Sequence, residues 1–480
     1  MSQLQKMSKK NLYSISDAKN LSIEDVHRLY NKHVNASRVE LLSVFDFGRE
    51  LVSHSEGMYI YTKDGKKIFD FTGGIGVLNH GHNHPRILQV RKDFQNEKRM
   101  EVHRNYFSQY IAALSSNISN LLPGDLNYCF FPNSGSESVD WALKTAFKYH
   151  QGNRKNILFS DIAFHGKLFG SESVTNSPEN FFEYPKIPGT HQFTFNSLES
   201  VSQKIDNLRD KNGKCTVAGI IIEPINISNL KKCSSDFLFG LRKICDREDI
   251  VLIFDEVYSG WCKTGELFYF MNFNGLIPDI LCMAKSFGGG KASISGLVTR
   301  DKVFKKSFET PLSANLQTST FYGFGEETIT AIESINILIE ENYSQKAKDI
   351  EVNLIKGFTT LKEKFPEIIS DFRGSGGVFG LFIKETPKII DNLINLVPGE
   401  LFKDKRFMSK LILASIISEL YSSHNILTFT SLGKELHLII SPSLVATNED
   451  INYFFTSIDE VLSKGILNLI LKFSKKKFLK

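Results

Sequence analysis

Two ionisable residues stand at the ends of short apolar runs and could act together in chemistry. Lys285 lies between the apolar run Ile280–Met283 and the glycine cluster Gly288–Gly290. Asp255 closes the apolar run Ile250–Phe254. A lysine in such surroundings is poorly explained as a solvated surface charge. A partly desolvated lysine is a nucleophile that can form a Schiff base, and a carboxylate can partner the ring nitrogen of a pyridinium cofactor, so the pair predicts pyridoxal phosphate (PLP) chemistry.

Asp255 needs a positively charged or strongly donating partner. A carboxylate at the end of a buried strand is costly unless such a group meets it. The protonated nitrogen of a pyridine ring meets that need, and so would a lysine, an arginine or a metal ion. The six cysteines form no CxxC pair and no cluster with nearby histidines, so we expect no metal site. A salt bridge to a lysine or arginine stays open as the alternative to the cofactor.

Ser134, Gly135 and Ser136 have the pattern of a phosphate site. They stand between a predicted buried strand, Leu126–Phe131, and a predicted helix. Backbone N–H groups and the helix dipole at such a junction can hold a phosphate, and the hydroxyls add donors. An ordinary serine N-cap with a turn glycine is the alternative. The helix is indicated by apolar residues spaced along one face: Val139, Ala142, Leu143, Ala146 and Phe147.

Phe164 and Gly166 follow another short apolar run, Asn156–Phe159. An aromatic ring at this place could stack on a planar cofactor, and the glycine would allow a close approach. The alternative is a phenylalanine of the hydrophobic core, which the 39 phenylalanines of the chain favour. Both interpretations stay open.

The elements that must position these residues alternate between strand and helix from about residue 73 to 325. This order predicts an α/β fold with a mainly parallel sheet, in which ligand groups gather at the carboxyl ends of the strands. Beyond that region, the expected elements are a helix over 326–341, a polar helix to about residue 365, and strands over 377–383 and 436–440. We expect four parts: an N-terminal arm or segment of the small domain over 1–72, a large α/β domain that binds PLP over 73–325, a small α+β domain over 326–464 and a basic tail over 465–480.

The composition is that of an ordinary globular protein and disfavours several functional classes. The 480 residues are 41% hydrophobic and 23% charged, which is enough for two domains with sizeable cores. The net charge of +5 is spread along the chain, which predicts no nucleic-acid binding. Met1–Tyr13 lacks the apolar core of a secretion signal, no apolar stretch approaches membrane-spanning length, and the cysteines form no disulfide pattern. We therefore expect a cytoplasmic protein.

Taken together, these segments resemble the class III aminotransferases, a PLP-dependent family that includes the ω-aminotransferases. The resemblance extends from about Tyr59 to Leu462 and implies the PLP-dependent transferase fold of type I. Its most specific part runs from Asp255–Gly265 through Pro278 and Asp279 to Lys285 and the glycine cluster. Shorter matches follow the family's order: Gly81–Pro85, Asn133–Glu137, Phe164–Gly166 and Glu223 with Pro224.

The resemblance implies a role for each matching residue. Lys285 and Asp255 would be catalytic, with Lys285 holding PLP as a Schiff base and then moving a proton, and Asp255 keeping the pyridine nitrogen protonated. Thr320 matches a threonine that reaches the phosphate bound by the neighbouring subunit, which implies a homodimer with shared active sites; a turn hydroxyl is the alternative. The remaining cofactor-binding residues would hold the phosphate or surround the ring: Ser134, Gly135, Ser136, Phe164, His165 and Val257.

The chain departs from the family at two positions that sort substrates. Where the family commonly has a glutamate five residues after the Glu-Pro pair, this chain has Ser228, and Ile439 stands where a carboxylate-binding arginine is expected. An apolar residue cannot replace a bidentate clamp on a carboxylate, so the usual pairing of glutamate with 2-oxoglutarate is in doubt. Three nearby residues could act instead: Arg373, Lys434 and His437. Asn226 and Lys263, the latter in place of an arginine, are smaller departures.

The two ends of the chain lie at or beyond the limits of the resemblance. Residues 14–50 predict a helix and an arm packed on a partner subunit, and in Phe45–Arg49 we favour a structural role over contact with substrate. Residues 465–480 carry five lysines in their last nine positions and could lie on an anionic membrane surface. A frayed, solvated helix end is the interpretation we favour for this tail.

The function implied is transfer of an amino group from an amine or amino acid to a carbonyl acceptor through a Schiff base at Lys285. A racemase, epimerase or aminomutase of the same fold is the alternative. A third hypothesis is a non-catalytic relative that serves in assembly or membrane docking, against which the presence of both Lys285 and Asp255 argues. The donor, the acceptor and the pathway depend on loop contacts that the sequence does not place.

Overall fold

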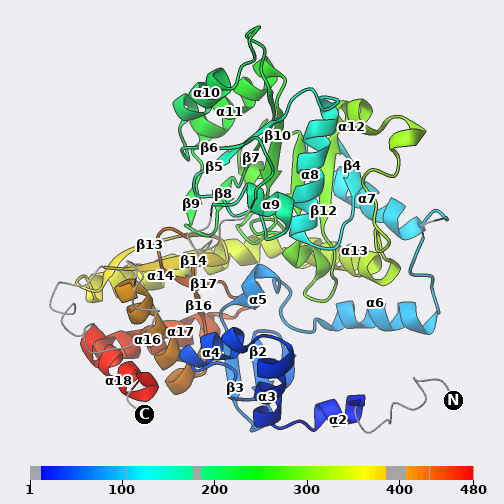
Figure 1. Cartoon of the computed structure of the whole chain (residues 1–480). Helices are drawn as coiled ribbons and strands as arrows, with labels where there is room; N and C mark the ends of the chain where they lie inside the picture. The colour runs from blue at the N-terminus through cyan, green and yellow to red at the C-terminus, as the bar shows by residue number, and fades with distance from the viewer. Residues whose placement is uncertain (1–11, 104, 177–184, 385–406, 432, 479–480) are drawn as a thin grey trace.

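The computed structural model describes residues 12–103, 105–176, 185–384, 407–431 and 433–478, and its centre is a seven-stranded sheet (Figure 1). All but the last two residues of the Met1–Tyr13 segment fall outside these ranges. The strand order is β4-β12-β11-β10-β7-β5-β6. Strand β12 is antiparallel to its neighbours β4 and β11, and the pairs from β11 to β6 are parallel. The predicted α/β fold with a mainly parallel sheet is confirmed. The strands are β4 (Leu126–Phe130), β5 (Asn156–Ser160), β6 (Thr190–Phe193), β7 (Val217–Ile222), β10 (Val251–Asp255), β11 (Ile280–Met283) and β12 (Gly296–Arg300).

Helices cover both faces of this sheet because alternate residues of its strands are buried on opposite sides. Val251 and Ile253 of β10 pack in one cluster with the apolar face of helix α8 (Gly135–Tyr149), while Leu252 and Phe254 belong to a second cluster. This alternation follows from the two-residue period of a strand. The other helices along this part of the chain are α6 (Pro85–Asn96), α7 (Gln109–Leu121), α9 (Phe169–Ser173), α10 (Leu198–Asn207), α11 (Ser235–Glu248), α12 (Asp301–Phe308) and α13 (Gly325–Glu340), with short 3-10 turns η2 (Tyr269–Asn272), η3 (Lys285–Gly288) and η4 (Pro311–Ser313).

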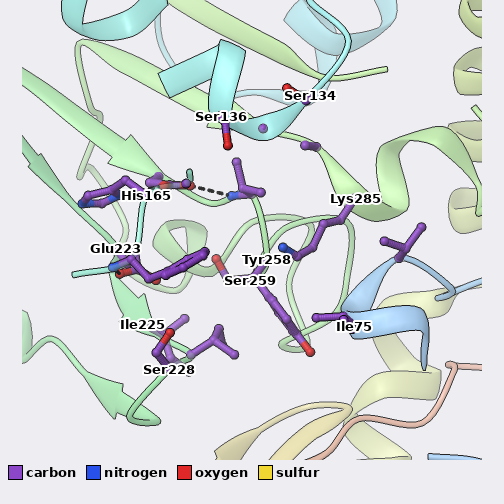
Figure 2. A pocket seen from close by; sticks show the side chains of 18 of the residues that line it. Ile75, Ser134, Ser136, His165, Glu223, Ile225, Ser228, Tyr258, Ser259 and Lys285 are labelled. Carbon is purple, nitrogen blue, oxygen red and sulfur yellow. Dashed lines mark hydrogen bonds and ion pairs between the residues drawn. The ribbon is translucent and has the colours of Figure 1, made fainter. Parts of the chain in front are cut away.

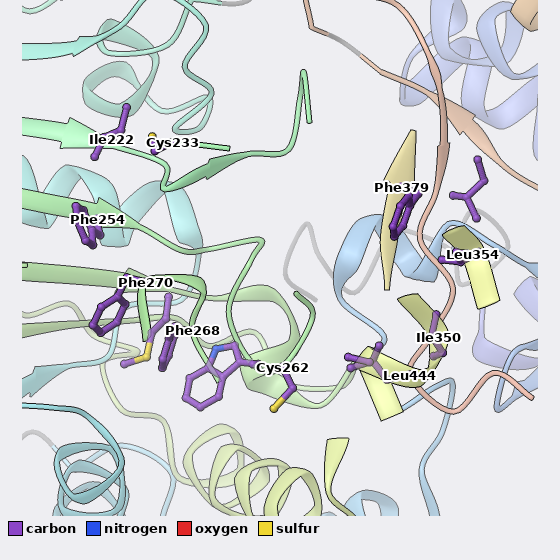
Figure 3. Packing of buried hydrophobic residues seen from close by; sticks show 14 of the residues in the cluster. Ile222, Cys233, Phe254, Cys262, Phe268, Phe270, Ile350, Leu354, Phe379 and Leu444 are labelled. Carbon is purple, nitrogen blue, oxygen red and sulfur yellow. The ribbon is translucent and has the colours of Figure 1, made fainter. Parts of the chain in front are cut away.

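The chain after α13 forms a smaller antiparallel sheet packed with helices. Its strand order is β13-β14-β17-β16, and the expected strands over 377–383 and 436–440 correspond to β14 and β17. Figure 3 shows buried residues of this part, such as Leu354 and Phe379, in the same hydrophobic cluster as Ile222 and Phe254 of the large sheet. The elements are α14 (Tyr343–Lys364), β13 (Ile369–Ser375), β14 (Val378–Ile383), α16 (Phe407–His424), β15 (Ile426–Leu427), β16 (Phe429–Thr430), β17 (Leu438–Ile440), α17 (Asn448–Ser463) and α18 (Ile466–Phe478).

The N-terminal segment joins the C-terminal part through a third sheet, of order β1-β2-β3-β15. Ile426 of β15 pairs in parallel with Phe69 of β3, so residues from the two ends of the chain share one sheet. The limits of the four expected parts stay a prediction. The N-terminal elements are α2 (Ile15–Lys19), α3 (Ile23–His33), α4 (Ala36–Val44), β1 (Val52–Glu56), β2 (Tyr59–Thr62), β3 (Lys67–Asp70) and α5 (Gly73–Gly76), while β8 (Ile225–Asn226) and β9 (Lys231–Lys232) form a separate pair.

Helix α18 corrects the interpretation of the C-terminal tail as a frayed, solvated helix end. Its residues Leu469, Ile470 and Phe473 are buried, and the helix packs against α16. Lys472 Nζ donates to both carboxylate oxygens of Glu419 at 2.9 and 2.8 Å. Lysines further along the helix pair with Asp46, whose side chain is 1% exposed. The apolar face of the tail therefore packs on the protein, and none of the described helices is long and apolar enough to cross a membrane.

Candidate active site

Four adjacent strands end at one cavity of about 420 Å³. Strands β5, β7, β10 and β11 run in parallel, so their carboxyl ends lie at the same edge of the sheet. Asp255 is the last residue of β10 and pairs with Cys282 of β11, and Lys285 follows three residues after that cysteine. Figure 2 shows Lys285, Ser136 and Glu223 around the same space. Strand register thus brings together two residues that are far apart in the sequence.

Lys285 is held in an unusual backbone conformation where β11 gives way to the turn η3. Its φ is +51°, in the left-handed region that non-glycine residues rarely adopt. Its Nζ lies 4.8 Å from the centre of the Tyr258 ring, within the range of a cation–π contact. Burial lowers the pKa of Lys285 below its ordinary value, while Asp255 and Glu223 oppose this shift. The amine is therefore closer to its neutral, nucleophilic form than that of a surface lysine.

Asp255 is 5% exposed and is oriented through both of its carboxylate oxygens. One oxygen lies 2.7 Å from Nδ1 of His165, and the other accepts the backbone N–H of Val257 at 3.0 Å. Among the described residues its ion-pair partner is this histidine rather than a lysine or arginine. Nε2 of His165 is buried and has no hydrogen-bond partner within the described part of the chain. Asp255 is thus fixed in place without a permanently charged cation beside it.

Ser134, Gly135 and Ser136 line the cavity at the N-terminus of α8. Ser134 is the helix N-cap, and its hydroxyl accepts the N–H of Glu137 at 3.3 Å, as the alternative interpretation expected. A side chain at Gly135 would meet Cγ1 of Val257 at 2.8 Å, so only glycine leaves this wall open. A helix N-terminus bordered by hydroxyls and glycine is suited to an anion such as a phosphate.

Phe164 and Val257 also line the cavity, as does Glu223 at the end of β7. Glu223 accepts the N–H of Phe164 at 3.0 Å and an N–H of Asn226 Nδ2 at 2.6 Å. Burial raises the pKa of Glu223 to about 7. From the sequence, Glu223 is only part of a family match and has no predicted role in the site. The signal was present, because Glu223 directly follows the apolar run 217–222, as Asp255 follows its own run.

The structure separates the predicted residues that meet at the cavity from those that do not. Thr320 is exposed and is not among the described residues that line the cavity. Eight of the predicted residues line it together: Ser134, Gly135, Ser136, Phe164, His165, Asp255, Val257 and Lys285. Ser228 and Ile439 line the cavity as well. The role of Thr320 toward a second subunit stays a prediction.

The three basic residues considered as substitutes for an arginine at position 439 all have other partners. Arg373 bonds to Glu435 and lies over the ring of Phe382 at 3.8 Å. Lys434 Nζ lies 3.8 Å from Asp161, and His437 Nδ1 bonds to the carbonyl of Glu435 at 2.8 Å. None of the three is among the described residues that line the cavity. Ile439 itself occupies the position in question.

The described residues fit PLP. The N-terminus of α8 suits the phosphate, and Asp255 can meet a protonated ring nitrogen in place of a permanent cation. Gly135 and Val257 both line the cavity, and they approach so closely that a side chain at position 135 would meet Cγ1 of Val257 at 2.8 Å. Lys285 supplies an amine of lowered pKa in the same cavity. These features agree with the chemistry that the sequence predicts.

Comparisons with known proteins agree with the fold and with the family that the sequence resembles. The family model for aminotransferase class-III matches residues 48–462. The structure is similar to a transaminase from the marine bacterium Virgibacillus, with 20% identity, a TM-score of 0.80, and coverage of 93% of this chain and 99% of that chain. It is also similar to acetylornithine aminotransferase from Elizabethkingia anophelis, with 22% identity, a TM-score of 0.72, and coverage of 92% and 99%. An ornithine aminotransferase from Toxoplasma gondii, with partial occupancy of PLP at its active site, gives 19% identity, a TM-score of 0.75, and coverage of 96% and 97%.

Proposed function

The chain belongs to the class III aminotransferase family, and from that premise we propose how its own residues carry out the reaction. The protein is a PLP-dependent aminotransferase that moves an amino group from a donor to a carbonyl acceptor. One observation carries the assignment of residues. Lys285 and Asp255 lie at the carboxyl ends of two hydrogen-bonded parallel strands and line one cavity.

Lys285 is proposed as the catalytic residue that holds the cofactor and moves the proton. When bound, PLP supplies an aldehyde carbon that takes up the amino group and a ring that accepts electrons when the donor loses a proton. Lys285 Nζ would bind the cofactor covalently and, once the donor has displaced it, carry the proton between donor and cofactor. Its lowered pKa supports this role, because both steps need the neutral amine.

Asp255 is proposed to keep the pyridine nitrogen protonated. Its contacts with His165 and the N–H of Val257 hold the carboxylate in one orientation. A buried carboxylate stabilises a nearby positive charge strongly because little water screens the interaction. His165 would act through Asp255 as a positioning residue.

The phosphate and the ring are proposed to bind between α8 and the ends of the strands. Gly135 and Ser136 at the N-terminus of α8 would bind the phosphate, with Ser134 holding the end of the helix in shape. Phe164 and Val257 would enclose the two faces of the ring. The missing side chain at Gly135 supports this arrangement, because any larger residue would run into Val257.

A homodimer with shared active sites is proposed from exposed apolar residues near Thr320. Phe321 is 57% exposed and lies four residues before the start of helix α13, and Phe107 is fully exposed two residues before the start of α7, which packs against α13. Large apolar side chains exposed near one another are one mark of a protein interface. Thr320 would reach the cofactor phosphate of the neighbouring subunit across this interface.

The compartment is proposed to be the cytoplasm. All six cysteines are free, and burial raises the pKa of Cys233 and Cys282, which keeps these thiols protonated. Free buried thiols are typical of proteins from a reducing compartment.

The test of the proposed function is a donor-only incubation of the holoenzyme with and without Lys285. We expect stoichiometric release of a carbonyl product together with conversion of PLP to its amino form. Lys285→Ala should lose the visible absorbance of the lysine-bound cofactor and slow the reaction by at least about 10³-fold. Lys291→Ala, which changes an exposed lysine a few residues away, serves as the control. Inversion or isomerisation of the donor without the amino form of the cofactor would contradict aminotransfer.

A further inference from the structure

One side of the cavity is an apolar wall that belongs to a hydrophobic cluster of its own. Ile225, Ile227 and Ile439 line the cavity and are 1%, 5% and 4% exposed. They pack together in this cluster, with Tyr258 and Phe429 against them, and both of these aromatic residues also line the cavity. Because these side chains pack against one another, they form one continuous apolar surface of the cavity.

The register of two short strands decides that Ile439 faces this wall. Ile439 of β17 pairs with Gly380 of β14 and with Phe429 of β16. Its neighbours Leu438 and Ile440 belong to the main hydrophobic cluster, while Ile439 belongs to the wall cluster. Since strand side chains alternate, a shift of one residue would place a different side chain in the cavity. The register therefore makes the isoleucine a lining residue.

The described residues that line the cavity include no arginine, and Lys285 is their one lysine, so they offer no spare cation to a substrate carboxylate. The acidic residues among them are Asp255 and Glu223. Lys285 is assigned to the cofactor, and nearby Lys263 donates instead to the carbonyl of Pro442 at 2.7 Å. A substrate carboxylate placed against the wall would be desolvated without a cation, and Glu223 would repel it when ionised.

We infer that the donor is a primary amine with an uncharged, apolar body, which binds against the wall formed by Ile225, Ile227, Phe429 and Ile439. The corresponding product is an apolar aldehyde or ketone. This inference rests on the proposed function and names the substrate class of the same site. A donor that carries an α-carboxylate loses this contact, because the wall offers methyl groups and an aromatic ring where the carboxylate needs hydrogen-bond donors.

The first experiment compares donors on the wild-type holoenzyme. We expect kcat/KM for hexylamine and benzylamine to exceed that for L-glutamate, L-alanine and L-ornithine by at least about 100-fold, since an unpaired buried carboxylate is strongly disfavoured. Lys285→Ala gives the background rate. Putrescine, a diamine, tests whether Glu223 recruits a second amine instead. If glutamate, ornithine or putrescine is the best donor, the inference is wrong while aminotransfer stands.

The second experiment probes the apolar wall of the cavity with two reagents and needs no catalytic turnover. Aminooxyacetate and O-benzylhydroxylamine share one nucleophilic group, whose nitrogen bonds to the cofactor carbon as the nitrogen of Lys285 leaves as an amine. We measure the rate at which each reagent abolishes the visible absorbance of the holoenzyme. We then divide this rate by the rate of the same reagent with free PLP and compare the two ratios. The benzyl reagent should be favoured by at least about 10-fold. Equal rates, or a preference for the carboxylate, would overturn the inference. If the benzyl preference appears but no donor yields a carbonyl product, the proposed function fails and the apolar subsite remains.

The third experiment changes the wall at Ile439. Ile439→Arg should raise kcat/KM for L-glutamate and lower it for hexylamine, each by at least about 10-fold, because a guanidinium can clamp a carboxylate. Ile439→Leu, which preserves apolar volume, should keep the wild-type preference. Retained visible absorbance and circular dichroism show that each variant is folded. If the arginine variant fails to fold, the wild-type donor panel and the two reagents decide the inference by themselves.

Discussion

At the scale of single residues, this site depends on how burial changes the ionisation of its side chains. Lys285 and Glu223 line the same cavity, and burial shifts the pKa of both toward the neutral form, downward for the amine and upward for the carboxyl. The same physical cause thus favours a nucleophilic lysine and a carboxyl that can be protonated near neutral pH. The Glu223 carboxyl is held in place by hydrogen bonds that it accepts from the backbone N–H of Phe164 and from the side-chain amide of Asn226.

Glu223→Gln should change how the stability of the apoenzyme depends on pH. The pKa of Glu223 is raised from 4.5 to about 7 in the folded protein, so its stabilising effect is full below 4.5 and is lost as the pH rises through 7. From pH 5 to pH 8 the wild type should therefore lose about 2–3 kcal/mol of unfolding free energy relative to the variant. Urea unfolding at several pH values measures this difference. Glu363→Gln, at an exposed glutamate, is the control, and parallel curves for wild type and Glu223→Gln would contradict the prediction.

At the scale of elements, the C-terminal helix α18 is held to the protein by its apolar face and by ion pairs on buried carboxylates. Glu419 of α16 is 4% exposed and accepts from Lys464 and Lys472. Burial raises the pKa of Glu419, but the hydrogen bonds from these lysines outweigh burial and lower it to about 2. The lysines that made this tail resemble a membrane-binding segment thus include members of a buried polar network.

Lys472→Met should destabilise the protein by roughly 1–2 kcal/mol at pH 7, because Glu419 loses one of its charged partners. The folded-state pKa of Glu419 lies below its usual 4.5, so this contribution is present above pH 4.5 and disappears as the pH falls toward 2. The difference in urea midpoint between wild type and variant should therefore shrink in acid. Lys475→Met changes an exposed lysine of the same helix and should leave the midpoint unchanged. Equal effects of the two substitutions at pH 7 would count against the network.

At the scale of the whole molecule, three sheets combine segments that are distant in the sequence. The sheet β1-β2-β3-β15 joins both ends of the chain, and the main hydrophobic cluster continues from the large sheet into α14 and β14. The cavity lies where these parts meet, since its lining comes from the large sheet, from α5 and from β16 and β17. In the proposed homodimer, Thr320 adds a contribution from the second subunit.

Mixing two inactive variants tests the shared site. If Thr320 completes the site of the neighbouring subunit, a heterodimer of Lys285→Ala with Thr320→Ala has one doubly altered site and one intact site. Random reassociation of equal amounts should then restore about one quarter of the wild-type sites. Cofactor retention and activity of the mixture measure the recovery. Recovery no greater than the average of the two separate variants would argue against a shared site.

Local patterns in the sequence were enough to predict PLP chemistry and to single out Asp255 and Lys285 for it. Each of the two follows an apolar run that is typical of a buried strand, and strand ends are where a parallel sheet binds ligands. The helix after Ser136 was predictable for a similar local reason, because its apolar residues have helical spacing. Local periodicity was sufficient for these features.

Which side chains face the cavity depends on contacts between segments that are distant in the sequence. Strand register directs Ile439 into it, while contacts with Glu435 and Asp161 hold Arg373, His437 and Lys434 elsewhere. The packing of α18 and the burial of Glu223 likewise depend on segments far away in the chain. Register and burial arise from long-range packing, which the local pattern of a sequence does not contain. The reaction type could therefore be predicted from the sequence, whereas the inferred class of donor depends on the fold.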